Sequence, residues 1–483
     1  MRWGRWKDWL AGRRGLRRLT VIYLASAASC CGFAVAATAA FVDLHVYRTG
    51  AAAIVHGAWL YGVRFWGLPF TYPPFAAIVL TPLAVIPWWA AVALMLLVNV
   101  AAIPVMFYLA LRLRPVAGWL GRGDAVRIAV AVAVIAIWLE PVYTNVAFGQ
   151  VNILLTIMVL IDLTLPEDSA IKGVATGIAA GIKLIPLIFV LYLAVTRRVR
   201  AAIVALGTFA ATIAIGFLVA PGASEYYYAD LTFLKSSRVA RLSNDWNQSL
   251  LGAVARTIGR EPGSRWLVLV LVVGLAGLAL AASAGRRGDD ATGYGLCAVT
   301  GLLVSPISWT HHWVMAVPAL MLLALAAWRR RREAPARARI WLAAIGVLAI
   351  IGWSGIARHQ PRMAPSRELH LSVFWQLVSE VYVLAGLAAL VIAAGAYLRL
   401  RTRRRPVPAA AAPAAVAATG HPSSPGRSGP VGQPDPRRQH DPLGQQSTAP
   451  QSAAAQQSAP AQQSAPAQQS DPGGGQLRPQ TSG

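Results

Sequence analysis

Long apolar blocks alternate along this chain with short polar or basic segments. Many blocks approach the ~20 residues that an α-helix needs to cross a bilayer. They are continuously apolar rather than alternating, which argues against a β-barrel. The pattern predicts an all-α polytopic membrane protein with twelve spans, at residues 19–40, 75–111, 126–146, 150–165, 170–182, 184–196, 201–220, 265–284, 292–307, 312–328, 340–356 and 373–398.

Two parts of this body do not fit straight crossings. The block 75–111 is too long for one, and its prolines at positions 82, 87 and 104 predict a broken helix whose first part lies in the outer interface. The blocks 170–182 and 184–196 are too short to cross alone. We expect them to form a half-depth hairpin that bends near Lys183.

The two ends of the chain differ from this body. Residues 1–18 carry seven Lys and Arg, and the apolar block after them exceeds the roughly 7–15 residues of a signal-peptide core. We therefore expect an uncleaved anchor helix behind a cytoplasmic basic N-terminus. Residues 399–483 are rich in Ala, Pro, Gln, Ser and Gly, which predicts a disordered cytoplasmic tail. The membrane domain then covers 19–398.

Composition and charge support this organisation. Of the 483 residues only 13% are charged, against about 25% in a soluble protein. The net charge of +25 comes mostly from short clusters between blocks, with 23 Lys and Arg in segments assigned to the inside and 11 in those assigned to the outside. This is the asymmetry of the positive-inside rule. We expect a multi-pass plasma-membrane protein with both termini in the cytoplasm and no nucleic-acid partner.

Polar residues gather where the predicted spans meet the outer face. Asp43 is a carboxylate at the mouth of a membrane helix, and such a group is a functional-site candidate by default. Amides and carboxylates bond sugar hydroxyls, aromatic rings stack on sugar faces, and a buried cation suits a lipid phosphate. The polar sets are Asp43, His45, Arg48, Tyr61, Arg64 and Tyr72; Glu140, Tyr143, Asn145, Gln150 and Asn152; Lys183; Asn244 to Ser249; and Ser305 to Trp313.

Most of these residues also fit simpler structural roles. Asp43 is also placed to cap the following helix. His311 and His312, flanked by two tryptophans, also suit interfacial anchors. Lys183 can extend its ammonium group to the headgroup region, and residues 244–248 fit ordinary loop polarity. The His311–His312 pair has no further histidine at metal-ligand spacing, so we expect no metal site.

Six motifs in order make the chain similar to a known family. Together they resemble glycosyltransferase family 87, whose known members are actinobacterial α-(1→2)-mannosyltransferases that use polyprenyl-phosphate mannose. The motifs cover the membrane body and leave out the tail. They are Phe41-Val42-Asp43-Leu44-His45-Val46-Tyr47, Phe70-Thr71-Tyr72-Pro73-Pro74-Phe75, Gly149-Gln150-Val151-Asn152, Ile182-Lys183-Leu184-Ile185-Pro186, Asn247-Gln248-Ser249-Leu250 and Ser305-Pro306-Ile307-Ser308-Trp309-Thr310-His311-His312-Trp313.

The resemblance implies a GT-C type membrane enzyme with its active site on the extracytoplasmic face. It implies a polyprenyl-phosphate mannose donor, no cofactor, and a mannosylated glycolipid acceptor such as a phosphatidylinositol mannoside, lipomannan or lipoarabinomannan. The acidic residue that the family carries in its first outer loop maps onto Asp43. Many GT-C enzymes have a large soluble outer domain and this chain has none, so short outer loops would have to recognise the acceptor.

An α product from a β-linked donor requires a single inverting displacement, for which one general base suffices. The predicted base is Asp43, with His311 or His312 as the alternative base or as an acceptor-orienting group. Lys183 or Arg64 would hold the departing phosphate. The remaining predicted substrate-binding residues are His45, Tyr47, Tyr72, Gln150, Asn152, Asn247, Gln248 and Trp309.

Other functions fit the same sequence. Twelve spans with both termini inside are common in transporters, so a secondary transporter or lipid flippase is one alternative, although the chain shows no internal symmetry. A GT-C enzyme for another lipid-linked sugar, such as arabinofuranose, is a second. The sequence leaves open the exact acceptor, the number of sugars added and the oligomeric state.

Overall fold

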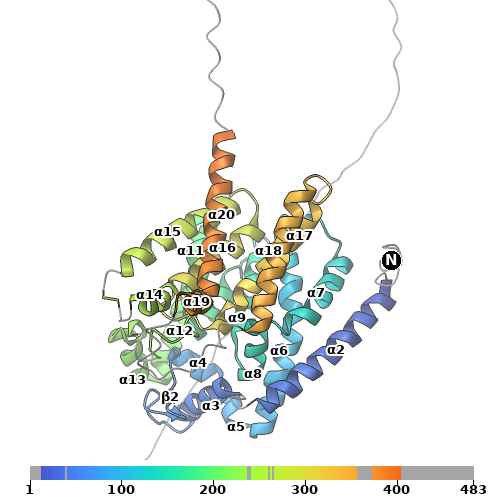
Figure 1. The fold of residues 1–483 in the computed structure, drawn as a ribbon. Coiled ribbons are helices and arrows are strands. Elements are labelled where there is room, and N and C mark those ends of the chain that lie inside the picture. The colour runs from blue at the N-terminus through green and yellow to red at the C-terminus, as the bar shows by residue number, and fades with distance from the viewer. Residues whose placement is uncertain are drawn as a thin grey trace, which may run out of the picture. The chain divides into compact units, whose positions relative to one another are not determined.

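The computed structural model describes residues 12–37, 41–235, 241–258, 262–263, 266–355 and 372–403. Its regular structure is almost entirely α-helical (Figure 1). Within those ranges seven helices are long and apolar enough to cross a membrane, and a bent pair is an eighth candidate. The seven are α2 (Gly12–Ala36), α6 (Trp88–Leu111), α12 (Val199–Val219), α15 (Trp266–Gly285), η5 with α17 (Thr310–Ala316 and Val317–Arg329), α18 (Pro335–Ser354) and α20 (Val381–Arg403), and the pair is α7 (Arg122–Ala136) with α8 (Glu140–Phe148).

These helices confirm the all-α polytopic class, but they do not confirm the predicted count of twelve spans. Four of the predicted spans form helices of only 9 to 15 residues, which is short of the ~20 that a crossing needs. An apolar run of this length also suits a helix buried inside the protein. The four are α9 (Asn152–Thr164), α10 (Val174–Ile182), α11 (Leu187–Val195) and α16 (Asp290–Val304).

Prolines divide the predicted span 75–111 as expected. It consists of α4 (Pro74–Val79), α5 (Thr81–Val85) and α6. Pro82 lies in the first turn of α5 and Pro87 is the N-cap of α6, whereas Pro104 lies inside α6 without ending it. The predicted broken helix is therefore confirmed, with its breaks before residue 88.

The predicted span 126–146 is not one straight helix. Its two parts, α7 and α8, are bent by 79°, and Pro141 stands in the first turn of α8. Proline is accepted at the start of a helix but interrupts one that continues through it. The bend carries Glu140 into the interior, where it is 2% exposed.

The predicted bend at Lys183 is confirmed, since this residue has extended backbone between α10 and α11. Gly173, the N-cap of α10, and Gly177 and Gly181 within it bring this helix against α12. A Cβ on Gly177 would lie 2.5 Å from the carbonyl oxygen of Ala205. Such small residues let membrane helices approach until their backbones are in contact. The contact with α12 therefore sets the position of α10 and of Lys183 at its end.

The segment between α2 and α4, predicted as an outer loop, is largely structured. It forms α3 (Val42–Val55) and an antiparallel hairpin of β1 (Arg64–Phe65) and β2 (Leu68–Pro69). Figure 1 shows α3, α5 and β2 together at the lower end, far from the last turns of α17 and α20 at the upper end. The other short elements are η1 (Val116–Gly118), α13 (Pro221–Ser224), η2 (Glu225–Ala229), η3 (Thr232–Leu234), α14 (Leu250–Ile258) and α19 (Val373–Ser379).

The last helix is longer than the predicted last span. Helix α20 continues to Arg403, beyond the predicted span end at residue 398, because its last residues alternate Leu with Arg and both favour helix. Most of the predicted tail, residues 404–483, and most of the basic N-terminus, residues 1–11, lie outside the described ranges.

We expect Gly177→Ala to lower stability by about 1–3 kcal/mol, because the added methyl group overpacks the α10–α12 contact. The measurement is thermal unfolding of the purified protein in detergent. Gly207→Ala in α12 is the matched control, since no atom lies within 4 Å of a Cβ there. Equal melting temperatures for the two variants would contradict the backbone contact.

Candidate active site

The first turn of α3 is held against the end of α8. The backbone N–H of Phe41 donates to the carbonyl of Ala147 at 2.7 Å. Gly149 follows α8 with a φ of +67°, and a Cβ there would lie 2.8 Å from Cβ of Leu44. Only glycine combines this left-handed conformation with so close an approach. As a result Gln150, the next residue, comes directly against α3.

Asp43 and Tyr47 are one helical turn apart on α3, so they share a face. The hydroxyl of Tyr47 donates to Oε1 of Gln150 at 2.6 Å and lies 3.3 Å from the hydroxyl of Tyr72. Asp43 also has a side-chain hydrogen bond with Gln150. The structure thus brings these four predicted residues together.

Lys183 is the cation of this cluster. Its Nζ donates to Oδ1 of Asn152 at 2.8 Å and lies 2.9 Å from Nε2 of His312, and it stands 5.3 Å from the centre of the Tyr72 ring. The residue is only 8% exposed. The alternative in which Lys183 extends to the headgroup region is therefore wrong. A buried ammonium group needs such partners because its desolvation is costly.

The two histidines open the 3₁₀ helix η5 and are both buried. An ammonium group only donates, so Nε2 of His312 accepts from Lys183. Nε2 of His311 lies 3.3 Å from Nε2 of Gln150, whose Oε1 already accepts from Tyr47 and from Asn152. The Gln150 amide must then donate to His311. Buried and bonded in this way, the histidines are not exposed interfacial anchors.

Asp43 is half-buried in the first turn of α3. The N-cap of that helix is Phe41, so Asp43 is not the capping residue, although a negative charge in a first turn is favourable. Burial raises the pKa of Asp43 to about 6, and the Gln150 hydrogen bond and the positive charge of Lys183 partly offset this effect. A carboxyl with a pKa near neutrality suits a general base.

Two of the predicted substrate-binding residues, His45 and Arg64, make their described contacts with other groups than this cluster. His45 is stacked between the rings of Phe65 and Trp88, with centroid distances of 4.1 and 3.7 Å. Arg64 is exposed in the β-hairpin, where Nη1 donates to the carbonyl of Gly67 at 3.0 Å. Of the two predicted phosphate-binding cations, the structure places Lys183 with Asp43 and leaves Arg64 at the surface.

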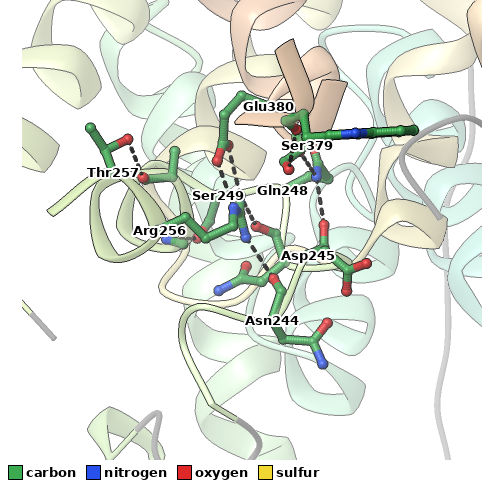
Figure 2. A network of polar contacts seen from close by, with 12 residues as sticks. Asn244, Asp245, Gln248, Ser249, Arg256, Thr257, Ser379 and Glu380 are labelled. Atoms are coloured by element: carbon green, nitrogen blue, oxygen red, sulfur yellow. Dashed lines mark hydrogen bonds and ion pairs between the residues drawn. The ribbon is translucent and has the colours of Figure 1, made fainter. Parts of the chain in front are cut away.

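A second polar network surrounds Gln248 (Figure 2), and Asn247 contributes to it. Asn247 donates to the carbonyls of Leu242 and Pro306 and accepts from the backbone of Ser308. Gln248 donates to the carbonyls of Asp245 and Ser379, and Trp309 pairs with Asn247 in an isolated β-bridge. These side chains join the 242–249 loop to η5 and α19. Their predicted contact with sugar hydroxyls stays a prediction.

An ion pair closes this network. Arg256 of α14 and Glu380, which precedes α20, form a two-point salt bridge at 2.5 and 2.6 Å, and Figure 2 shows the two side chains facing each other. Arg256 also donates to the carbonyls of Asn244 and Asn247. The loop 244–247 is thereby attached at both of its ends to Arg256, and through Arg256 to Glu380 at the start of α20.

Two residues of the site region were not among the predicted site residues. Asn145 donates to the carbonyl of His311 at 2.8 Å and accepts from Asn152 at 3.0 Å. Glu140 accepts from the hydroxyls of Thr310 and Tyr382 at 2.7 and 2.8 Å. Both position η5. The available signal was Glu140 itself, a carboxylate inside an apolar block.

Comparison with known proteins identifies the family. The model of glycosyltransferase family 87 matches residues 70–306. A polyprenol-phosphate-mannose-dependent α-(1-2)-phosphatidylinositol pentamannoside mannosyltransferase of Mycobacterium tuberculosis is 36% identical over 379 residues, which are 75% of this chain and 84% of that protein. The chain belongs to glycosyltransferase family 87.

Two further known proteins are similar to this chain. A polyprenol-phosphate-mannose-dependent α-(1-2)-phosphatidylinositol mannoside mannosyltransferase of M. tuberculosis is 33% identical, over 73% of this chain and 84% of that protein. An α-(1->3)-arabinofuranosyltransferase of Corynebacterium glutamicum is 30% identical over 44% of this chain and 49% of its own length. No solved structure matches the chain significantly. Membership of a glycosyltransferase family supports the enzyme over the alternative of a transporter or flippase.

Proposed function

We propose that this family 87 enzyme transfers mannose from polyprenyl-phosphate mannose to a phosphatidylinositol mannoside, through an α-(1→2) linkage, at the extracytoplasmic face of the plasma membrane. Two mycobacterial relatives are named for this donor and this class of acceptor, and this chain covers 84% of each. The observation that carries the proposal is the convergence of Asp43 and Lys183 in one polar cluster among apolar helices.

Asp43 acts as the general base. The acceptor hydroxyl attacks C1 of mannose, its proton passes to the Asp43 carboxylate, and the bond between C1 and the phosphate oxygen breaks. This is one in-line displacement and it inverts the anomeric carbon. Phosphate is a good leaving group, so no second carboxylic acid is required, in contrast to glycoside hydrolysis.

The two histidines serve as positioning residues in this mechanism. Nε2 of each is occupied, by Lys183 in His312 and by the Gln150 amide in His311. A base must present a free lone pair to the proton that it takes. That requirement favours Asp43 over either histidine.

Lys183 stabilises the departing phosphate. Its hydrogen-bond partners Asn152 and His312 are neutral groups, so its charge remains effective toward an anion. A fixed cation in a site with little water stabilises developing negative charge better than the same group in solution. Tyr72, under the ammonium group, adds an aromatic face next to the sugar position.

The sidedness of the proposal rests on charge. The cluster lies at the ends of α8 and α10 and the start of α9, and it includes Asp43 from the segment 41–72, which the lysine and arginine count assigns to the outside. At the opposite ends of α9 and α10, Glu167 pairs with Arg114 and Arg198, which belong to two basic segments of the kind expected at a cytoplasmic surface. Both termini are cytoplasmic in this arrangement.

Arabinofuranosyl transfer is the second candidate, favoured by the C. glutamicum relative. We expect the full-length protein in lipid vesicles to transfer mannose from polyprenyl-phosphate mannose and to leave polyprenyl-phosphate arabinofuranose unused. The product should lose its new sugar to an α-(1→2)-specific mannosidase. Transfer of arabinose alone would exclude the mannosyltransferase assignment.

Asp43→Asn should lower the rate of mannose transfer by about 10²–10⁴-fold, because the amide cannot accept the proton. Asp230→Asn is the matched control, since Asp230 is an exposed aspartate, and it should retain the wild-type rate. Rates are compared in the same vesicles at saturating donor. Near-normal turnover of Asp43→Asn would assign the base elsewhere.

The pH dependence follows from the raised pKa of Asp43, about 6. Above that pH the carboxylate is ionised and can take a proton, and below it the rate should fall about tenfold for each pH unit. The measurement is kcat/KM for the acceptor between pH 5 and 8. A flat profile across pH 6 would show that ionisation of Asp43 does not control the reaction.

A further inference from the structure

The helices that hold the candidate active site reach a charged surface at their opposite ends. Helix α9 begins at Asn152 in the cluster, and Glu167 follows its far end. Helix α10 ends beside Lys183, and Lys172 precedes its start. Glu167 and Lys172 form an ion pair at 3.3 Å. This pair therefore marks the end of the molecule opposite the cluster.

A cavity of about 560 Å³ opens at this opposite end. It lies where α11 passes into α12 and where α15 ends. Five arginines and one glutamate line it, together with small and apolar residues. The charged residues are Arg114, Arg197, Arg198, Arg200, Arg286 and Glu167.

The arginines of this cavity exceed the carboxylates that are available to them. Arg114 and Arg198 share Asp290 at 2.8 and 2.6 Å, and both also reach Glu167. These contacts use both carboxylates. In the described part of the chain no ion pair involves the other three arginines, whose recorded contacts are two hydrogen bonds to backbone carbonyls, from Arg200 to Asp168 and from Arg286 to Val195. The cavity is left with uncompensated positive charge.

An apolar stripe runs from the rim of the cavity along α12. Val199, Ile203 and Leu206 repeat at helical spacing and are 56%, 65% and 56% exposed. Exposed aliphatic side chains on a helix long enough to span a membrane face hydrocarbon. An acyl chain lying on this stripe would place its headgroup in the cavity.

The same end of the molecule carries paired tryptophans and arginines. Arg329 stands 4.8 Å from the ring centre of Trp119, and Arg331 stands 3.8 Å from that of Trp328. Trp and Arg are typical of the level where hydrocarbon meets headgroups. These pairs give the end of the molecule that holds the cavity the composition of a headgroup region.

We infer that this cavity binds the phosphate of an anionic phospholipid, with an acyl chain along the α12 stripe. Guanidinium groups bind phosphate through two parallel hydrogen bonds, and basic pockets between membrane helices on the cytoplasmic side suit anionic headgroups. The positive-inside asymmetry places this lipid in the cytoplasmic leaflet. The site is separate from the proposed mannosyl transfer, and it does not depend on that function.

The test is a titration of the purified full-length protein with phosphatidylglycerol, phosphatidylcholine or inorganic phosphate, followed by native mass spectrometry. Wild-type protein should bind phosphatidylglycerol in preference to the other two. Arg197→Gln with Arg286→Gln should weaken that binding about 30-fold, because two charges near an anionic headgroup are lost. Neither arginine has a carboxylate partner among the described residues, so the ion-pair network stays intact.

Arg337→Gln with Arg339→Gln is the matched control, because both are exposed in the first turns of α18 at the same end. It should bind the lipid as wild type does. If the first double variant does not fold, Arg200→Gln alone should still weaken binding about fivefold. Wild-type affinity in the cavity variants, or equal binding of phosphatidylcholine, would overturn the inference. Equal binding of inorganic phosphate would reassign the cavity to a soluble ligand.

Discussion

The candidate active site depends on the buried ammonium group of Lys183. Removing such a charge from water is costly, and the cost is tolerable only when the group is fully bonded. Its partners come from three separate parts of the chain: Asn152 opens α9, His312 opens η5, and Tyr72 precedes α4. The position of one side chain therefore fixes three segments relative to one another.

The partners of Lys183 fix the direction of the next hydrogen bonds. Oδ1 of Asn152 accepts from Lys183, so its amide nitrogen donates to Asn145 and to Gln150. Oε1 of Gln150 then receives two donors, and its own nitrogen turns to His311. The orientation of each amide group is therefore set by the donors and acceptors around it. The result is a site in which both histidines are acceptors.

Local features of this fold could be predicted from the sequence, and contacts between distant segments could not. Proline positions gave the break before residue 88, and a polar residue between two apolar runs gave the bend at Lys183. The bend between α7 and α8 was missed because residues 128–139 are apolar throughout and Glu140 was taken to lie within the same span. Helix α3 was missed because polar residues such as Asp43 and Arg48 made its segment look like a loop.

The candidate site shows the same difference between residues that can be selected singly and contacts between distant segments. Asp43, Gln150, Asn152, Lys183 and the two histidines were selected one by one as polar residues at predicted helix mouths, and the structure brings them together. Arg256 was not selected, because its role depends on Glu380, 124 residues further on. Asn247 and Gln248 satisfy loop carbonyls. Residue type alone does not distinguish an amide that braces a loop from one that faces a ligand.

Charge balance gives a physical reason for pairing one carboxylate with one buried cation. In the proposed reaction the donor phosphodiester carries one negative charge, and the released phosphate monoester carries about two at neutral pH. Asp43 loses its charge when it takes the acceptor proton. The negative charge therefore moves from the carboxylate to the phosphate while the total stays constant. Lys183 interacts electrostatically with Asp43 before transfer and with the phosphate after it. A low-dielectric site accommodates this exchange because no net charge is created in it.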